Sequence, residues 1–341
     1  MQHALDFSDV LIVPTKTTIG SRKQVNLENT FDFRYSNQRL TCLPIMAANM
    51  DTVGTIDVMK VLAENDMFTC LHKFISLEEF KDNKDFLSQN LDNFAVSIGF
   101  NNDEITRLKE IQKIVNFKVI CIDIANAYIQ DFVAFCSRVR EAFPSSIIIA
   151  GNVCTAEGVE QLITDGKVDI VKCGIGGGSA CTTRIKTGVG MPQFSCVLEC
   201  SKKAHELGAH MISDGGITCP GDLAKAFGAG ADFVMVGGQF AGHDQNPGEI
   251  IEENGKRYKT FYGMSSTHAM KKNYGEKKSY RTSEGRYIKI PYKGCLSDTI
   301  EDFLGGLRST CTYVNCSNID EILSKVEFVR VNQQYNRSLV N

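Results

Sequence analysis

The sequence lacks the features that mark membrane, exported and nucleic-acid-binding proteins. No stretch approaches the roughly 18 apolar residues of a membrane-spanning helix. The first ten residues, MQHALDFSDV, have neither a basic segment nor an apolar core, so we expect no export. The 37 lysines and arginines do not outnumber the 40 aspartates and glutamates, and the net charge is −3. Neither a nucleic-acid polymer nor a membrane is therefore expected as a partner, because both require clustered basic residues.

The sequence also has no Cys-x-x-Cys pair and no histidines spaced for zinc. Its thirteen cysteines are an odd number and are scattered along the chain, which favours a reducing, cytoplasmic compartment. Most of them, including Cys70, Cys121 and Cys173, lie in apolar runs, where a thiol is usually a small buried side chain. The same interpretation applies at first to Cys181.

Eight short apolar runs alternate with helix-length segments, which is typical of βα units around a parallel sheet. Runs such as VICIDIA lack strict alternation, as strands buried on both faces do. The predicted strands are Pro44–Ala48, Phe68–His72, Phe94–Gly99, Val119–Ile124, Ile147–Ala150, Ile170–Cys173, Met211–Ser213 and Phe233–Val236. Eight strands close a barrel. We therefore predict an α/β fold, a (β/α)₈ TIM barrel, as one catalytic domain over residues 1–341.

The predicted helices are Thr55–Glu64, Leu77–Leu91, Glu104–Val115, Gln130–Phe143, Ala156–Thr164, Gln193–Leu207, Asp222–Phe227 and Thr299–Leu307. A long insertion, Gln239 to Asp298, follows the eighth strand. Its Asn254-Gly255 pair predicts a β-hairpin, and the Gly-, Lys- and Tyr-rich stretch after it predicts a mobile loop. A loop in this position lies over the mouth of a barrel, where active sites are built.

The strongest local signal is the glycine-rich segment KCGIGGGSACTTR, residues 172–184, directly after the sixth strand. Glycines allow the backbone to approach a ligand closely, and Cys181 then stands at the catalytic end of the barrel. The hydroxyls of Thr182 and Thr183, the guanidinium of Arg184 and exposed amides favour a reactive thiolate, because such surroundings lower a thiol pKa. Spacing alone leaves open the alternative of a flexible turn around a buried thiol.

Two further groups of residues are candidates for nucleotide binding. Ser213-Asp214-Gly215-Gly216 and Gly237-Gly238 follow the seventh and eighth strands, where many barrels bind phosphate. Asp214 should face sugar hydroxyls, with a helix N-cap as the alternative. Within the insertion, the segments Gly263–Ser266 and Tyr280–Gly285 are weaker signals, and a solvated charged loop is their alternative.

Taken together, these segments resemble the IMP dehydrogenase / GMP reductase family. The resemblance rests on the G-I-G-x-G-S-x-C-T-T-R loop, the D-G-G-I turn, the A-F-G-A-G-A-D-F-V-M-V-G-G strand and G-M-S-S, and it covers essentially the whole chain from DFSDVLIVP onward. Two positions depart from the family pattern. Gly177 stands where proline is common, and Ala127 stands where glycine is usual.

Within the family, the chain resembles the reductase branch. Leu71-His72-Lys73 passes directly into the next helix, so the CBS insertion typical of the dehydrogenases is absent. The loop sequences YGMSSTHAMKK and YRTSEGR resemble those of reductases and have no counterpart of the arginine that activates water in dehydrogenases. Ser309–Tyr313 resembles the reductase segment that meets the cofactor of a neighbouring subunit. A dehydrogenase without the CBS insertion and a silent purine-nucleotide binder are the alternatives.

The resemblance implies reductive deamination of GMP to IMP and ammonia with NADPH, through a thioimidate between Cys181 and purine C2. Thr183 and Glu284 would form the relay that protonates the leaving amine. The residues implied for binding GMP or IMP are Ser179, Asp214, Gly215, Gly216, Gly237, Gly238, Gly263, Met264, Ser265, Arg281, Ser283 and Gly285.

The resemblance also implies a cofactor site, a cation site and an assembly. The residues implied for binding NADPH are Ser21, Arg22, Lys73, Asp123, Ile124, Ala125, Ile175, Gly176, Met264, Tyr280, Arg281, Ser309, Thr310, Cys311 and Thr312. A K⁺ ion would be held by backbone carbonyls of the cysteine loop, at Gly176, Gly178 and Cys181, with Arg184 adjacent. Because the cofactor site would be shared between subunits, the expected assembly is a homotetramer.

Overall fold

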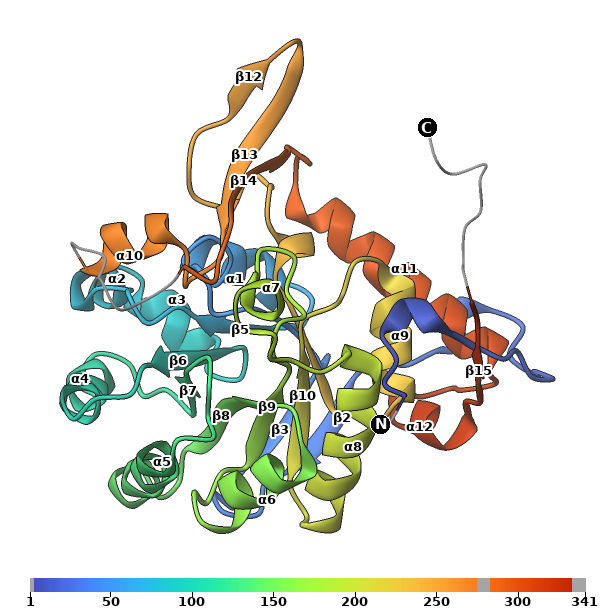
Figure 1. The fold of residues 1–341 in the computed structure, drawn as a ribbon, viewed down its shortest axis with the longest axis horizontal. Helices are drawn as coiled ribbons and strands as arrows, with labels where there is room; N and C mark the ends of the chain where they lie inside the picture. The colour runs from blue at the N-terminus through green and yellow to red at the C-terminus, as the bar shows by residue number, and fades with distance from the viewer. Residues whose placement is uncertain (1–2, 275–282, 333–341) are drawn as a thin grey trace.

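A computed structural model describes residues 3–274 and 283–332 of the chain. Eight parallel strands form a closed barrel in the order β10-β11-β4-β5-β6-β7-β8-β9 (Figure 1). The strands are β4 (Ile45–Ala47), β5 (Phe68–Leu71), β6 (Phe94–Ile98), β7 (Val119–Asp123), β8 (Ile147–Val153), β9 (Ile170–Cys173), β10 (His210–Asp214) and β11 (Phe233–Val236). All eight predicted strands and the predicted barrel are confirmed.

The helices between the strands cover the outside of the barrel: α1 (Ile56–Ala63), α2 (Leu77–Asp82), α3 (Lys84–Gln89), α4 (Asp103–Gln112), α5 (Gln130–Ala142), α6 (Ala156–Thr164), α8 (Gln193–Glu206), α9 (Pro220–Gly228) and α11 (Leu296–Tyr313). Ser76 begins α2 with a capping box, and Thr155 caps α6 through its hydroxyl. Serine and threonine are among the residues preferred at the start of a helix, so the sequence itself favours these two starts.

Two helix predictions differ from the structure. The helix predicted over Leu77–Leu91 is split at Asn83, which leaves the helical conformation while its side-chain amide donates to the carbonyl of Glu79 at 2.9 Å. The last predicted helix, Thr299–Leu307, is longer and forms α11. Its buried face, which includes Leu296, Ile300 and Leu307, continues to Cys311, so packing carries the helix beyond the predicted end.

The amino end of the barrel is closed by a hairpin that the sequence analysis did not predict. Strands β2 (Asn29–Asp32) and β3 (Arg39–Cys42) are antiparallel. Phe31, Phe33 and Leu40 of this hairpin segment pack with the barrel-interior side chains of Phe68 and Phe233. The hairpin therefore seals the bottom of the barrel and leaves the carboxyl ends of the strands available for a site.

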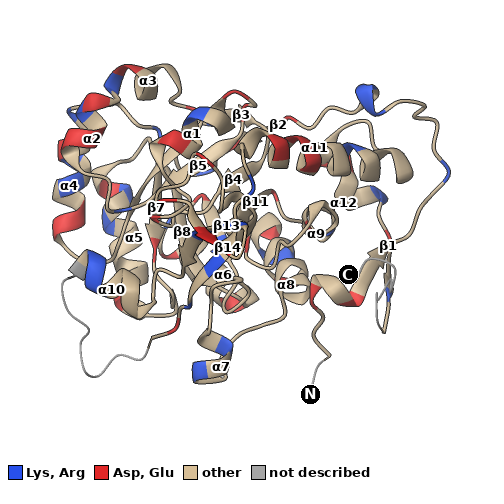
Figure 2. Ribbon diagram, turned by 90° about the horizontal axis from the view of Figure 1, so that it is seen from above, with Lys and Arg blue, Asp and Glu red and all other residues tan. Residues whose placement is uncertain are grey.

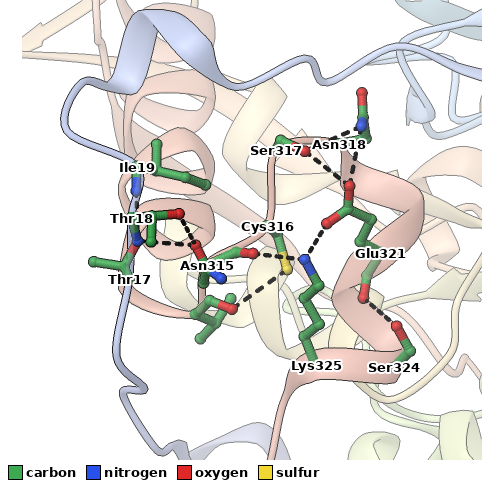
Figure 3. Close-up of polar contacts among 11 residues, drawn as sticks. Thr17, Thr18, Ile19, Asn315, Cys316, Ser317, Asn318, Glu321, Ser324 and Lys325 are labelled. Carbon is green, nitrogen blue, oxygen red and sulfur yellow. Dashed lines mark hydrogen bonds and ion pairs between the residues drawn. The ribbon is translucent and has the colours of Figure 1, made fainter.

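The two ends of the described chain meet beside α11. Strand β1 (Val10–Ile12) pairs antiparallel with β15 (Phe328–Arg330), and Oδ1 of Asn315 accepts from the backbone N–H of Thr18 at 3.1 Å (Figure 3). Nζ of Lys325 donates to the carbonyl of Asn315 at 2.7 Å. These bonds hold the amino-terminal segment against the chain that follows α11.

The insertion after β11 forms a small sheet above the barrel mouth. Strands β12 (Ile251–Glu253) and β13 (Lys256–Tyr262) are joined by Asn254 and Gly255, whose φ values of 52° and 71° fit a type I′ turn, so the predicted hairpin is confirmed. A third strand, β14 (Tyr287–Pro291), pairs with β13, and α10 (Thr267–Tyr274) follows β13. Parts of the stretch predicted as a mobile loop instead form α10 and β14, while residues 275–282 of that stretch lie outside the described residues.

Across residues 3–274 and 283–332, every helix is too short or too polar to cross a membrane. Lysines and arginines alternate with aspartates and glutamates over helices α1 to α4 (Figure 2). Charge on this side of the molecule is therefore mixed in sign.

Candidate active site

The three predicted catalytic residues meet at the carboxyl end of the barrel. Cys181 lies in the loop after β9, just before the short helix α7 (Thr183–Thr187), and is partly exposed. Its thiol donates to Oγ1 of Thr183 at 3.2 Å, and that hydroxyl donates to Oε2 of Glu284 at 2.7 Å. The result is a continuous thiol, hydroxyl and carboxylate chain, and the interpretation of Cys181 as a fully buried thiol is wrong.

Backbone contacts join the cysteine loop to the insertion. The N–H of Thr182 donates to the carbonyl of Glu284 at 2.8 Å, and the N–H of Arg286 donates to the carbonyl of Ala180 at 2.8 Å. Within the insertion, a Cβ atom on Gly285 would lie 2.8 Å from the backbone nitrogen of Ser266, so these two backbone segments can approach closely only because residue 285 is glycine. The insertion thus supplies Glu284 to a loop that precedes it by about one hundred residues.

Arg184 anchors the cysteine loop from its other side. Its guanidinium donates to Oδ2 of Asp6 at 3.1 Å and to the carbonyl of Met191 at 2.5 Å. Oδ1 of Asp6 accepts from the N–H of Gln193 at 2.6 Å. Arg184 therefore stabilises the loop through its guanidinium, which has no acceptor and cannot be a metal ligand. Among the described residues, no group of three or more His, Cys, Asp or Glu side chains is placed to hold a metal ion.

The loops after β9, β10 and β11 come together, as the predicted phosphate site requires. Gly216, with a φ of 78°, donates its N–H to the carbonyl of Gly177 at 3.0 Å. A Cβ atom on Gly238 would lie 2.5 Å from Oγ of Ser179, so a larger residue there would displace this hydroxyl. Gly237 precedes a short 3₁₀ helix, η3 (Gly238–Phe240).

Asp214 is the last residue of β10, and its side chain points into the top of the barrel. Its Oδ2 accepts from the amide of Asn152 at 2.8 Å and from Nζ of Lys172 at 2.9 Å. The N-cap of the following helix, α9, is Cys219, so the alternative of Asp214 as a helix N-cap is wrong.

Lys172 is a site residue to which the sequence analysis assigned no role. Its side chain is 2% exposed, and Nζ lies 2.7 Å from Oδ1 of Asp123. Burial opposes its charge, but attraction to Asp123 and Asp214 prevails and raises the pKa of Lys172 well above its usual value. Burial acts against the charged form of Asp123 as well, yet Lys172 holds the pKa of this carboxyl below its usual value. The sequence feature that could have identified Lys172 as a site residue is a lysine within the otherwise apolar run IVKC, because buried lysines are rare.

The predicted cofactor residues fall into two groups. Asp123, Ile124 and Ala125 lie at the end of β7, while Ile175 and Gly176 are in the cysteine loop and Lys73 follows β5. Ser21 and Arg22 begin η2 (Arg22–Gln24), which packs against α11. Helix α11, whose last turns carry Ser309, Thr310, Cys311 and Thr312, runs away from the barrel mouth toward β15 (Figure 1).

Individual cofactor candidates differ in what their side chains offer. The Cys311 thiol is fully buried in the core, and burial raises its pKa to about 12. The hydroxyl of Thr312 donates to the carbonyl of Ser309 at 2.7 Å. Sδ of Met264 accepts from the N–H of Asp51 at 3.4 Å. Tyr280 and Arg281 lie outside the described residues.

A polar clamp attaches helix α10 to the barrel, and sequence reasoning missed it as well. Oδ2 of Asp51 accepts from the hydroxyl of Tyr262 at 3.0 Å and from Nζ of Lys272 at 3.1 Å. Asp51 and Lys272 also line a cavity of about 470 Å³ between α10 and helices α1 and α2. The clamp fixes the segment that carries Met264 and Ser265 over the mouth.

Known proteins resemble this chain in sequence over nearly its whole length. Residues 4–337 match the sequence model of the IMP dehydrogenase / GMP reductase domain. The chain belongs to this family. It is 52% identical over 333 residues to mouse GMP reductase 1, covering 97% of this chain and 96% of the mouse protein. It is 52% identical over 336 residues to human GMP reductase 2, covering 97% and 95% of the two chains.

A nematode member of the IMP dehydrogenase / GMP reductase family is similar to this chain as well. The GMP reductase of Caenorhabditis elegans is 50% identical over 334 residues, which cover 97% of this chain and 93% of the nematode protein. The family resemblance drawn from the sequence motifs is therefore confirmed over nearly the whole chain.

Proposed function

We propose that this chain is an NADPH-dependent oxidoreductase that converts GMP to IMP and ammonia. The observation that carries this proposal is the Cys181–Thr183–Glu284 chain at the barrel mouth. It occurs in a sequence that is about half identical to GMP reductases over 97% of its length. A protein that only bound purine nucleotides would not need these three groups in contact.

In the proposed first half-reaction, the sulfur of Cys181 adds to C2 of the guanine, and the bond from C2 to the amino nitrogen breaks. The thiol proton passes through Thr183 and Glu284 to the departing amine, which leaves as ammonia. A thioimidate between Cys181 and the purine remains. The hydrogen bonds between the thiol, the hydroxyl and the carboxylate support this route, because they join the proton donor to the acceptor.

The second half-reaction replaces sulfur with hydrogen at C2. NADPH, when bound, supplies the hydride. A proton taken from solvent reaches the sulfur of Cys181 as its bond to C2 breaks, so the sum is GMP, NADPH and one proton giving IMP, ammonia and NADP⁺. Glu284 and Thr183 deliver this solvent proton, which restores the starting thiol.

The loops around the cysteine would hold the nucleotide. Asp214 would accept hydrogen bonds from the ribose, and the hydroxyl of Ser179 with the amides after β10 and β11 would bind the phosphate. The residues proposed to frame the base are Gly263, Met264, Ser265, Arg281, Ser283 and Gly285. The close approach of Gly238 to Ser179 supports a site in which backbone amides face a bound anion.

The division of the cofactor residues supports a shared site and a homotetramer. In one chain, Asp123 and Lys73 follow strands of the barrel, whereas η2, which begins at Arg22, packs against α11. A cofactor that contacts both groups would bridge two copies. The thirteen free thiols support a cytoplasmic location.

The carbonyls of Gly176, Gly178 and Cys181 are proposed to hold K⁺. Gly176, with a φ of 83°, lets the loop turn sharply, and Gly178 accepts from the N–H of Cys181 at 3.0 Å while keeping a second lone pair. Replacing K⁺ by tetramethylammonium should lower turnover. Unchanged turnover after this exchange would remove the cation from the proposal.

The activity is tested by mixing the purified chain with GMP and NADPH and following the absorbance of NADPH, with chromatography to identify IMP. Oxidation of NADPH that requires GMP is expected. Reduction of NAD⁺ with IMP, without NADPH oxidation, would instead identify the dehydrogenase reaction. Binding of GMP with neither reaction would identify a silent nucleotide binder.

A further inference from the structure

The ammonium of Lys172 lies beneath the candidate active site with all three of its N–H groups engaged. Its Nζ lies 2.7 Å from Oδ1 of Asp123, 2.9 Å from Oδ2 of Asp214 and 3.3 Å from Oδ1 of Asn49. An ammonium has three donors. The three acceptors come from β7, β10 and the loop after β4, so one cation ties together distant parts of the barrel rim.

The two carboxylates belong to different halves of the proposed site. Asp214, which also accepts from Asn152 on the same oxygen at 2.8 Å, is assigned to the ribose of the nucleotide. Asp123, at the end of β7, is assigned to the cofactor side. Their strands are separated in the barrel by β8 and β9, and Lys172 extends from β9 to reach both.

We propose that Lys172 is a positioning residue that couples occupancy of the nucleotide side to occupancy of the cofactor side. The inference rests on the proposed function. A hydroxyl that donates to Asp214 competes with Lys172 for that carboxylate, and the ammonium then shifts its bonding toward Asp123. The same shift occurs in reverse when a ligand engages Asp123. Coupling of this kind is reciprocal, because each ligand changes the affinity for the other by the same factor.

Removing the cation should uncouple the two sides. Without Lys172, the carboxylates of Asp123 and Asp214 form a like-charge pair in a largely enclosed site, and one of them takes up a proton. The ammonium that contacted both carboxylates is then absent, so a ligand at one carboxylate no longer redistributes the hydrogen bonds of that ammonium to the other. Met matches the length of Lys without its charge, so Lys172→Met removes the link with little change in volume.

The test measures binding of IMP by calorimetry, with and without saturating NADPH. This pair of ligands cannot react with each other. The wild-type chain should show IMP affinities that differ by about fivefold or more between the two conditions. In Lys172→Met the difference should fall below about twofold, while circular dichroism confirms a folded chain.

A matched control is Lys225→Met, since Lys225 is also buried but donates to the carbonyl of Phe7. This variant should keep the wild-type difference between the IMP affinities measured with and without NADPH. If Lys172→Met does not fold, the pair Lys172→Met and Asp123→Asn restores the charge balance, and it should show the same loss of interdependence.

The inference would be overturned if the Lys172 variants kept the wild-type difference between the IMP affinities measured with and without NADPH. It would also be overturned if NADPH did not change the IMP affinity of the wild-type chain. A wild-type chain that binds neither ligand would instead contradict the proposed function itself. The two failures are therefore distinguishable.

Discussion

Cys181 and its hydrogen-bond partners carry the proposed chemistry at the scale of single residues. The Cys181 thiol contacts Thr183, and Thr183 contacts Glu284, so the Thr183 hydroxyl links the thiol to the carboxylate. Of thirteen cysteines, ten are buried, Cys219 is exposed, and Cys181 and Cys295 are partly exposed. Exposure together with this relay distinguishes Cys181 from the buried structural thiols.

Replacing the nucleophile should separate binding from turnover. Cys181→Ala should abolish NADPH oxidation, because no covalent intermediate can form, while the Kd for GMP stays within about tenfold of the wild type. Steady-state kinetics and calorimetry measure the two quantities. Cys219→Ala, at an exposed position, is the control and should keep full turnover. Undiminished turnover in Cys181→Ala would refute the nucleophile assignment.

At the scale of helices and strands, single buried interactions hold neighbouring elements together. The contact between α5 and the residue before β9 is an example. Arg140 of α5 donates to Oδ2 of Asp169 at 2.5 Å, and it also donates to the carbonyls of Lys167, Pro144 and Ser146. Both charged side chains are at least nine-tenths buried. Removing one partner leaves the other charge buried without its counterion.

Arg140→Met should therefore reduce the free energy of unfolding by about 3–5 kcal/mol, measured by denaturant titration. The control is Lys118→Met, which breaks the exposed ion pair with Asp92. That variant should change stability by no more than about 1 kcal/mol. Equal losses in the two variants would contradict the role assigned to burial.

A second link joins α8, β10 and the start of β11. Asp232 accepts from His205 at 2.9 Å and from His210 at 3.1 Å. The hydrogen bond to Asp232 raises the pKa of His205, and at His210 the same carboxylate outweighs the opposing effect of burial and raises its pKa too. Groups with raised folded-state pKa values stabilise the fold below their unfolded pKa of about 6.5, and this contribution is lost as the pH rises through the folded values.

The contribution of this link to the Tm should accordingly be larger at about pH 6 than at about pH 8. Asp232→Asn should flatten this dependence, because the amide cannot stabilise the imidazolium ions. Calorimetric Tm values at the two pH values measure the difference. Asp131→Asn, at an exposed position, should keep the wild-type slope. A wild-type slope in Asp232→Asn would contradict the assignment.

At the scale of the whole molecule, the proposed cofactor residues of one chain fall into two groups, one after β5 and β7 and one at η2 and α11. Arg22 begins η2, which packs against α11, whereas Cys181 follows β9 and Asp123 ends β7. The hydrogen bonds of Asn315 to Thr18 and Lys325 hold the amino-terminal segment in this position (Figure 3). A complete site in the proposed assembly would combine Cys181 of one copy with Arg22 of another.

This arrangement predicts complementation between inactive variants. Cys181→Ala and Arg22→Glu should each be nearly inactive alone. Mixed assemblies formed by co-expression should recover turnover, because some sites then pair an intact Cys181 with an intact Arg22. NADPH oxidation by the co-purified mixture measures the recovery. Turnover no greater than the sum of the separate variants would show that each site is formed within one chain.

The sequence by itself determined the barrel, the position of the cysteine loop and the Asn254-Gly255 hairpin. Each depends on local information: the length of an apolar run, the spacing of turn residues, or a dipeptide that accepts positive φ. Glu284 was placed in the relay only through family resemblance, because about one hundred residues separate it from Thr183.

Only the tertiary structure decided which polar groups meet. The Lys172 contacts join residues from β7, β9, β10 and the loop after β4, and they exist because the closed barrel points these side chains inward at one level. The hairpin that seals the barrel bottom and the Asp51 clamp on α10 likewise depend on packing between distant segments. Local periodicity carries no information about such pairings, since they arise from chain closure.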